Sequence, residues 1–261
     1  MHKYLNASEA ASIAEAYKRS EKRLVLLDYD GTLVPFHCDP ALALPDEYLM
    51  RLLEDMTQEK NLDLVIISGR NRQFLEKVFS TLNATIFGEH GAVFRIKYKW
   101  SSIKSDTTWK QEIREIMQEA VECTPGSNLE KKENSIVWHY RRADQEIAEK
   151  CIPELIKKLT PVCNRNNLSI MKGRKIVEVK PSDYTKGTTI MNFFDCSKYD
   201  FILAAGDDTT DEDLFEALPG NAITIHVGSS SDASSYRIRN SNEFVNFLRS
   251  IISTPDIGAW I

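Results

Sequence analysis

Residues 24–33 have the sequence Leu24-Val25-Leu26-Leu27-Asp28-Tyr29-Asp30-Gly31-Thr32-Leu33. The opening apolar run, bounded by turn-forming residues, predicts a buried parallel strand. Alternate residues of a strand share a face, so Asp28 and Asp30 would point the same way, and Gly31 permits a sharp turn after them. Open α/β sheets hold ligands at the carboxyl ends of their strands, so we expect a site here.

An ordinary turn or helix cap is the alternative interpretation of this segment, and it would be the better one for Asp-x-Asp alone. The whole string Asp-x-Asp-Gly-Thr behind an apolar strand is much rarer. By composition it occurs by chance in on the order of one in several hundred chains of this length. The segment therefore favours a functional site.

The composition is that of a globular protein. A chain of 261 residues can form one large domain or two smaller ones, and an apolar content of 42 % argues against disorder. The formal net charge of −5 disfavours binding to nucleic acid or to an anionic membrane surface. We find no apolar signal segment and no run long enough to span a bilayer. We therefore expect neither a nucleic-acid nor a membrane partner.

The cysteines are widely spaced and include no Cys-x-x-Cys pair, which favours reduced thiols and a cytoplasmic location. His37 precedes Cys38, but the pattern does not indicate a catalytic cysteine. The five cysteines are Cys38, Cys123, Cys151, Cys163 and Cys196.

Strand and helix patterns alternate in the first third of the chain and again after residue 183, which predicts a Rossmann-like, doubly wound parallel sheet of the α/β class. Between these parts lies an α+β pattern: a helix at 109–122, a strand at 135–141, a helix at 144–159 and a hairpin about Gly173. We interpret it as an inserted cap domain. The expected divisions are an N-terminal helical segment at 1–22, a core at 23–93 and 181–254, and an α+β cap at 94–180.

Two helix boundaries follow from local signals. The first helix is expected over residues 8–20, with Ser8 as its N-cap. Another is expected over 72–82, after the strand at 62–67.

Four groups of polar residues end core segments: Asp28 with Asp30, Ser68, Lys186, and Asp207 with Asp208. Each has a simpler explanation, since Ser68 could cap a helix, Lys186 could be solvated and the acidic run could favour a helix N-terminus. Together they match what hydrolysis of a phosphate monoester needs: a nucleophile, a proton donor and cations. Mg²⁺ prefers carboxylate and carbonyl oxygens, which Asp28, Asp207 and the Asp30 carbonyl could supply.

These motifs resemble those of the haloacid-dehalogenase-like phosphohydrolases. The resemblance implies that Asp28 is the nucleophile and that Asp30 is the general acid and later the base. It also implies that Thr32, Ser68 and Lys186 bind the phosphate. The implied Mg²⁺ site comprises Asp28, Asp30 and Asp207, with Asp208 and Asp211 as direct or outer ligands.

Further strings resemble the trehalose-6-phosphate phosphatase family from about Arg23 to Leu248. They are Ile67-Ser68-Gly69-Arg70, Gly88-Glu89-His90-Gly91, Glu130-x-Lys132, His139-Tyr140-Arg141, Val177-Glu178-Val179-Lys180-Pro181 and the acidic run Gly206–Asp213. The resemblance implies Mg²⁺-dependent hydrolysis of trehalose 6-phosphate to trehalose and phosphate through an aspartyl-phosphate. A disaccharide site needs polar side chains that point inward; the alternative is the solvated face of a cap sheet. The candidate sugar contacts are Glu89, His90, Glu130, Lys132, His139, Arg141 and Glu178.

Three alternatives remain open. The chain could hydrolyse another sugar phosphate, such as sucrose phosphate, although the Glu-His-Gly and His-Tyr-Arg strings argue against it. A response-regulator receiver domain uses similar residues but is much shorter and has no cap-sized insert. The chain could also be a non-catalytic phosphatase-like domain of a larger trehalose synthase polypeptide, and a trehalose-phosphate synthase domain or subunit is a candidate partner.

Overall fold

The structure is a computed structural model that describes residues 3–37, 39–103, 106–228 and 233–252; Cys38 lies outside them. The described chain forms two compact units, Ser102–Tyr184 and the remainder. No helix within these ranges has the length and apolarity needed to cross a membrane.

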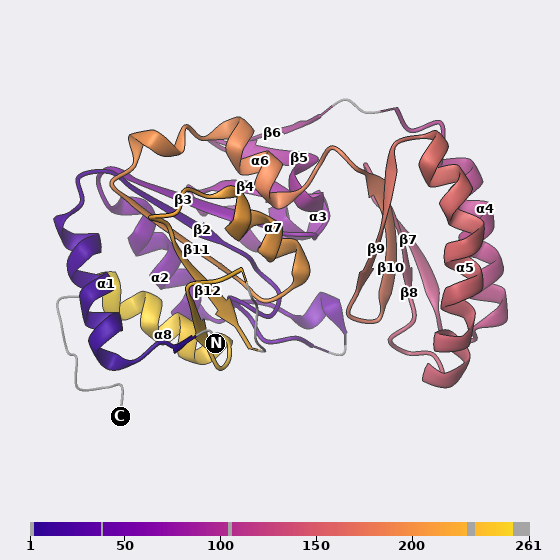
Figure 1. Ribbon diagram of the computed structural model, residues 1–261, viewed down its shortest axis with the longest axis horizontal. Coiled ribbons are helices and arrows are strands. Elements are labelled where there is room, and N and C mark those ends of the chain that lie inside the picture. Colours follow the sequence, from indigo (N-terminus) through magenta and orange to yellow (C-terminus); the bar gives the residue numbers. More distant parts are fainter. Residues whose placement is uncertain (1–2, 38, 104–105, 229–232, 253–261) are drawn as a thin grey trace. The chain divides into compact units, whose positions relative to one another are not determined.

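The larger unit is built on a nine-stranded sheet in the order β1-β13-β12-β11-β2-β3-β4-β5-β6. Figure 1 labels its strands from β12 to β6. The neighbours from β1 to β4 pair in parallel, and β5 is antiparallel to β4. The strands are β1 (Lys3–Tyr4), β2 (Arg23–Leu27), β3 (Leu62–Ile67), β4 (Thr85–Gly88), β5 (Val93–Ile96), β6 (Lys99–Ser102), β11 (Phe201–Gly206), β12 (Ile223–Val227) and β13 (Tyr236–Ile238).

Helices cover both faces of this sheet, which confirms the predicted doubly wound core (Figure 1). Val25 and Leu27 of β2 belong to the cluster with α1, α2, α3 and α8. Leu24 and Leu26 belong to the cluster with α6 and α7. A strand buried on both faces has to be apolar throughout, as residues 24–27 are. The helices are α1 (Ala7–Arg19), α2 (Glu47–Gln58), α3 (Arg72–Phe79), α6 (Lys186–Phe193), α7 (Thr209–Ala217) and α8 (Ser241–Ile252), with 3₁₀ turns η1 (Pro40–Leu42), η2 (Glu89–Gly91) and η3 (Cys196–Lys198).

The second unit is an antiparallel sheet in the order β7-β8-β10-β9, with α4 and α5 packed against it (Figure 1). Val177 and Val179 of β10 belong to the apolar cluster under these helices, whereas Glu178 alternates to the other face. This α+β insert confirms the predicted fold class. Its elements are α4 (Lys110–Cys123), β7 (Asn128–Lys131), β8 (Ile136–His139), α5 (Gln145–Arg165), β9 (Leu168–Gly173) and β10 (Ile176–Pro181).

The second unit begins later than the expected residue 94, because β5 and β6 extend the core sheet. Arg95 of β5 helps to hold this strand on the core sheet. Its guanidinium is buried and donates to the carbonyl oxygens of Phe79 and Leu82, at 2.7 and 2.6 Å. These bonds satisfy the carbonyl of Phe79, the last residue of α3, and that of Leu82 just after it. The polar, aromatic composition of this segment did not reveal them.

Three helix boundaries differ from expectation. Asn6, not Ser8, is the N-cap of α1, since Asn6 and Glu9 form a reciprocal capping box. Helix α3 ends at Phe79 instead of residue 82. Helix α5 continues past residue 159 to Arg165 although it contains Pro153 and Pro161. Its buried apolar face stabilises it against these breaks, so tertiary packing outweighs propensity.

Candidate active site

Four adjacent parallel strands end in a polar residue of interest. Asp207 follows β11, Asp28 follows β2, Ser68 follows β3 and Glu89 follows β4. Because the strands are parallel, their carboxyl ends share one edge of the sheet. The local pairing is tight, since the amide of Asp28 donates to the carbonyl of Ala205 at 3.0 Å. The sheet order thus gathers residues far apart in sequence.

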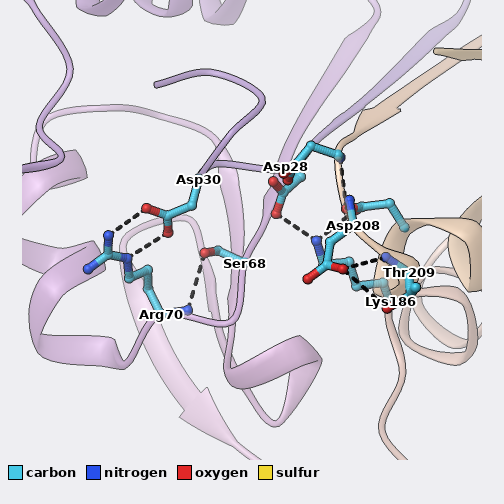
Figure 2. A network of polar contacts seen from close by, with 9 residues as sticks. Asp28, Asp30, Ser68, Arg70, Lys186, Asp208 and Thr209 are labelled. Carbon is cyan, nitrogen blue, oxygen red and sulfur yellow. Dashed lines mark hydrogen bonds and ion pairs between the residues drawn. The ribbon is translucent and has the colours of Figure 1, made fainter. Parts of the chain in front are cut away.

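Lys186, the first residue of α6, binds two carboxylates, of which Asp28 is labelled in Figure 2. Its Nζ lies 2.6 Å from Asp28 Oδ1 and 2.7 Å from Asp211 Oδ1. Lys186 is only 2 % exposed, so it is not the solvated lysine of the simpler interpretation. Burial alone would lower the pKa of Lys186, but the charges of Asp211 and Asp28 outweigh it and raise that pKa above its usual value.

Asp28, Asp207 and Asp211 form an acidic cluster whose ligand oxygens lie within 4.8 Å of one another. Burial raises the pKa of Asp28 to about 7, against the opposing charge of Lys186. Burial and the charges of Asp28 and Asp211 raise the pKa of Asp207 to about 9. The pKa of Asp211 is also raised by burial. Buried and half-buried carboxylate oxygens at this spacing fit a hard divalent cation, whose charge would compensate theirs.

Two glycines make room for the cluster. Gly31 has a φ of +86°, and a Cβ there would overlap the Asp207 carboxylate. A Cβ on Gly206 would overlap the carboxylate of Asp211. Glycine is therefore required at both positions, for close approach and, at Gly31, for backbone conformation as well.

Asp208 and Asp211 also cap α7. Oδ1 of Asp208 accepts a hydrogen bond from the amide of Thr209 at 2.7 Å (Figure 2). Oδ2 of Asp211 accepts from the amides of Asp207 and Asp208, both at 3.2 Å. The helix-terminus interpretation of the acidic run is thus part of the answer, and Asp211 serves both the cap and the cluster.

Asp30 lies apart from the cluster and pairs with Arg70 (Figure 2). Both carboxylate oxygens accept from the guanidinium, Oδ2 from Nε at 2.6 Å and Oδ1 from Nη2 at 2.5 Å. Arg70 is not among the site residues that the sequence predicts, although it belongs to the Ser-Gly-Arg string. A cation two residues after Ser68, just beyond the end of the strand next to the one that precedes the acids, was the available signal.

The hydroxyl-bearing residues of the two motifs, Thr32 and Ser68, are both buried. Ser68 accepts a hydrogen bond from the amide of Arg70 at 3.2 Å. Thr32 is 0 % exposed, and its hydroxyl has no hydrogen-bond partner among the described residues. A buried, unpaired hydroxyl is costly, so a ligand oxygen that paired with Thr32 would remove that penalty.

Glu89 and His90 form a buried, strained turn in η2. Both have left-handed backbone conformations, with φ of 50° and 59°. The amide of Glu89 donates to the Arg70 carbonyl and that of His90 to the Ser68 carbonyl, each at 3.0 Å. Consecutive strained residues are unfavourable unless the surroundings hold them, and such strain concentrates at functional sites.

The candidate sugar contacts of the second unit are two hydrogen-bonded pairs, Lys132 with Glu178 and Glu130 with His139, and the separate Arg141. Glu178 is 1 % exposed and its Oε1 accepts from Lys132 at 3.0 Å and from Ser135 at 2.5 Å. Glu130 and His139 form a partly exposed pair at 2.9 Å. Arg141 instead donates to the carbonyl of Arg174 at 3.1 Å. A solvated sheet face therefore does not describe Lys132 or Glu178.

A doubly wound parallel sheet with this acidic strand edge and an inserted α+β cap defines a haloacid-dehalogenase-like phosphohydrolase. Phosphatases of this class generally use a divalent metal. Residues 26–245 match the model of the trehalose-phosphatase family, and the chain belongs to that family.

Similar proteins agree with this assignment. A bifunctional trehalose-6-phosphate synthase/phosphatase of Thermoproteus tenax is 39 % identical over 90 % of this chain and 33 % of the relative. A trehalose-phosphatase of Zygosaccharomyces rouxii is 34 % identical over 79 % of this chain and 26 % of the relative. The solved C-terminal domain of trehalose-6-phosphate phosphatase from C. albicans is 28 % identical, with a TM-score of 0.89 over 97 % of this chain and 98 % of that one. The chain spans about a quarter to a third of the length of these curated relatives.

Proposed function

We propose that the chain hydrolyses trehalose 6-phosphate to trehalose and phosphate in a Mg²⁺-dependent reaction. The observation that carries this proposal is Lys186 between Asp28 and Asp211, at the strand edge of a chain in the trehalose-phosphatase family. The names of the Z. rouxii and C. albicans relatives support the substrate.

In the proposed first step, an Asp28 oxygen attacks phosphorus as the bond to the sugar oxygen breaks, which leaves an aspartyl-phosphate. Asp30 gives its proton to the departing sugar oxygen. In the second step Asp30 takes a proton from water, the resulting hydroxide attacks phosphorus, and phosphate leaves with Asp28 regenerated. Lys186 orients the Asp28 carboxylate by its 2.6 Å contact.

The phosphoryl oxygens need partners during both steps. Lys186 and the hydroxyls of Thr32 and Ser68 are the proposed donors. Asp28, Asp207 and Asp211 would hold Mg²⁺, with the Asp30 carbonyl and Asp208 as further ligands or supports. A bound Mg²⁺ supplies positive charge that neutralises the transferring group.

We propose that the sugar is recognised by hydrogen bonds from buried and half-buried polar side chains. The Lys132–Glu178 pair supports this role, because it places two nearly buried charged groups, 3.0 Å apart, whose nitrogen and oxygen atoms are suited to hydrogen bonds with sugar hydroxyls. The proposed contacts are Glu89, His90, Glu130, Lys132, His139, Arg141 and Glu178.

Hydrolysis of another sugar phosphate and a non-catalytic role are not favoured. The expected acids Asp28, Asp30 and Asp207 are all present, and degenerate domains usually lose an acid. The family and its phosphatase relatives also favour trehalose 6-phosphate.

We further propose that the phosphatase works with a trehalose-phosphate synthase, as a domain or a subunit, because the T. tenax relative is named for both activities. A cytoplasmic location is proposed as well. The four described cysteines are free, which is typical of reducing compartments.

The test is phosphate release from trehalose 6-phosphate with Mg²⁺ or with a chelator, beside glucose 6-phosphate and sucrose 6-phosphate. A metal-dependent preference for the first supports the proposal. Preference for another sugar phosphate would overturn the proposed substrate, and absence of activity on all three compounds would overturn the proposed enzymatic activity. Asp28→Asn is the chemical control, because near-normal activity in that variant would contradict the nucleophile.

A further inference from the structure

Arg70 fixes the orientation of a carboxylate for which the reaction has a specific use. The guanidinium binds Asp30 through two hydrogen bonds of 2.6 and 2.5 Å (Figure 2). A single contact would leave a carboxylate free to rotate, whereas a bidentate pair defines both its position and the plane in which it lies.

Arg70 is itself held at three further points. Its amide donates to Ser68 Oγ at 3.2 Å, and its carbonyl accepts from the amide of Glu89 at 3.0 Å. Its guanidinium lies 4.2 Å from the ring centre of Phe74. Phe74 in turn packs edge-on against Tyr29, which precedes Asp30. The guanidinium is therefore preorganised on the same framework that carries its partner.

We propose that Arg70 is a positioning residue for proton transfer by Asp30. This inference rests on the proposed function and deepens it. A carboxylate has about four lone-pair positions. The two hydrogen bonds from Arg70 leave the others for the proton that the sugar oxygen receives. Arg70 acts through Asp30 and does not contact the reacting atoms.

The first test compares two leaving groups. Trehalose 6-phosphate releases a sugar alkoxide that needs a proton, whereas p-nitrophenyl phosphate releases a stable phenolate that does not. We expect R70A to lower kcat on trehalose 6-phosphate by about 100-fold and on p-nitrophenyl phosphate by less than about 5-fold. R70K keeps the charge but loses the bidentate geometry, so its loss should be intermediate and equally selective. R72A, at an exposed arginine of α3, should behave as wild type.

The second test asks whether Arg70 acts through Asp30. In D30N the proton donor is already lost, so adding R70A should reduce turnover of trehalose 6-phosphate by less than about 3-fold more. Equal losses of R70A on both substrates, or a full further loss in the D30N background, would overturn the proposal and assign Arg70 to phosphate binding or to folding. Unchanged turnover in R70A would overturn it too.

Substrate assays of the wild-type enzyme distinguish a failure of this inference from a failure of the proposed function. If it prefers another sugar phosphate, the substrate assignment fails, and the same leaving-group comparison on that compound still decides the role of Arg70. If it hydrolyses none, both fail.

Discussion

The positive charge of Lys186 opposes the effect of burial, which raises the pKa of the Asp28 and Asp211 carboxyls. It contacts Asp28 and Asp211, and all three side chains are nearly inaccessible. A lysine in such a place is a fixed positive charge beside the acids, and in the proposed reaction it would also bind the phosphate.

Replacement of Lys186 by methionine should therefore damage both activity and folding. Loss of one partner leaves buried carboxylates unpaired, which costs about 3–5 kcal/mol in comparable pairs, and we expect turnover to fall at least about 100-fold. Denaturant unfolding and phosphate release measure the two effects. Lys198→Met is the matched control, because its pair with Asp195 is exposed; a similar result for both variants would contradict the assigned role.

The strands place the residues of the candidate site, by where each strand ends and by which face of the sheet each side chain occupies. Strand β11 ends at Gly206, where the chain passes so close to Asp211 that no side chain fits. Strand β10 places Glu178 on one face of the cap sheet and Val177 on the other.

Gly206→Ala should displace the Asp211 carboxylate and disturb the acidic cluster. We expect a destabilisation of about 1–3 kcal/mol, typical of overpacking, together with a large loss of turnover. Thermal unfolding and phosphate release would show it. Gly220→Ala is the control, since a Cβ there meets nothing within 4 Å; an equally damaged control would contradict the steric argument.

Glu178→Gln should weaken sugar binding while sparing the phosphoryl chemistry. It removes the charge that pairs with Lys132 but keeps the size of the side chain. We expect KM for trehalose 6-phosphate to rise at least about 10-fold, with little change in turnover of p-nitrophenyl phosphate. Lys172→Gln, at an exposed residue of β9, should change neither. Equal losses on both substrates would contradict a role in sugar recognition.

For the whole molecule, the acidic cluster should link stability to pH and, if it binds a metal as proposed, to metal as well. The pKa values of Asp28 and Asp207 are raised from 3.8 to about 7 and about 9. Between the ordinary pKa of 3.8 and the raised pKa, each of these carboxyls is protonated in the folded chain and ionised in the unfolded chain. The folded chain therefore binds more protons from about pH 4 up to about pH 9. Without metal, stability should therefore fall as pH rises through this window.

A bound divalent cation should reverse that trend, because it binds the ionised carboxylates and displaces their protons. We expect the increase in Tm produced by excess Mg²⁺ over a chelator to be larger at about pH 8.5 than at about pH 5.5. Thermal unfolding at both values measures it. An equal increase at both, or one unchanged in Asp207→Asn, would show that the cluster is not the metal site.

The sequence by itself determined the features that depend on neighbouring residues. The apolar run 24–27 specified a buried strand, and Asp28 to Thr32 indicated the haloacid-dehalogenase-like superfamily and the expected position of the candidate site. The alternation of strands and helices specified the doubly wound core. Strand period and turn chemistry are local, so they can be recognised without knowing what packs against them.

Only the tertiary structure decided which distant groups meet. Lys186 contacts Asp28 across 158 positions of the chain, and Arg70 pairs with Asp30 across 40. The membership of β5 and β6 in the core sheet depended on strand pairing and on the buried Arg95. The raised pKa values of Asp28 and Asp207 required burial beside other carboxylates. Such pairings and desolvation arise from strand order and packing, which no short stretch of sequence contains.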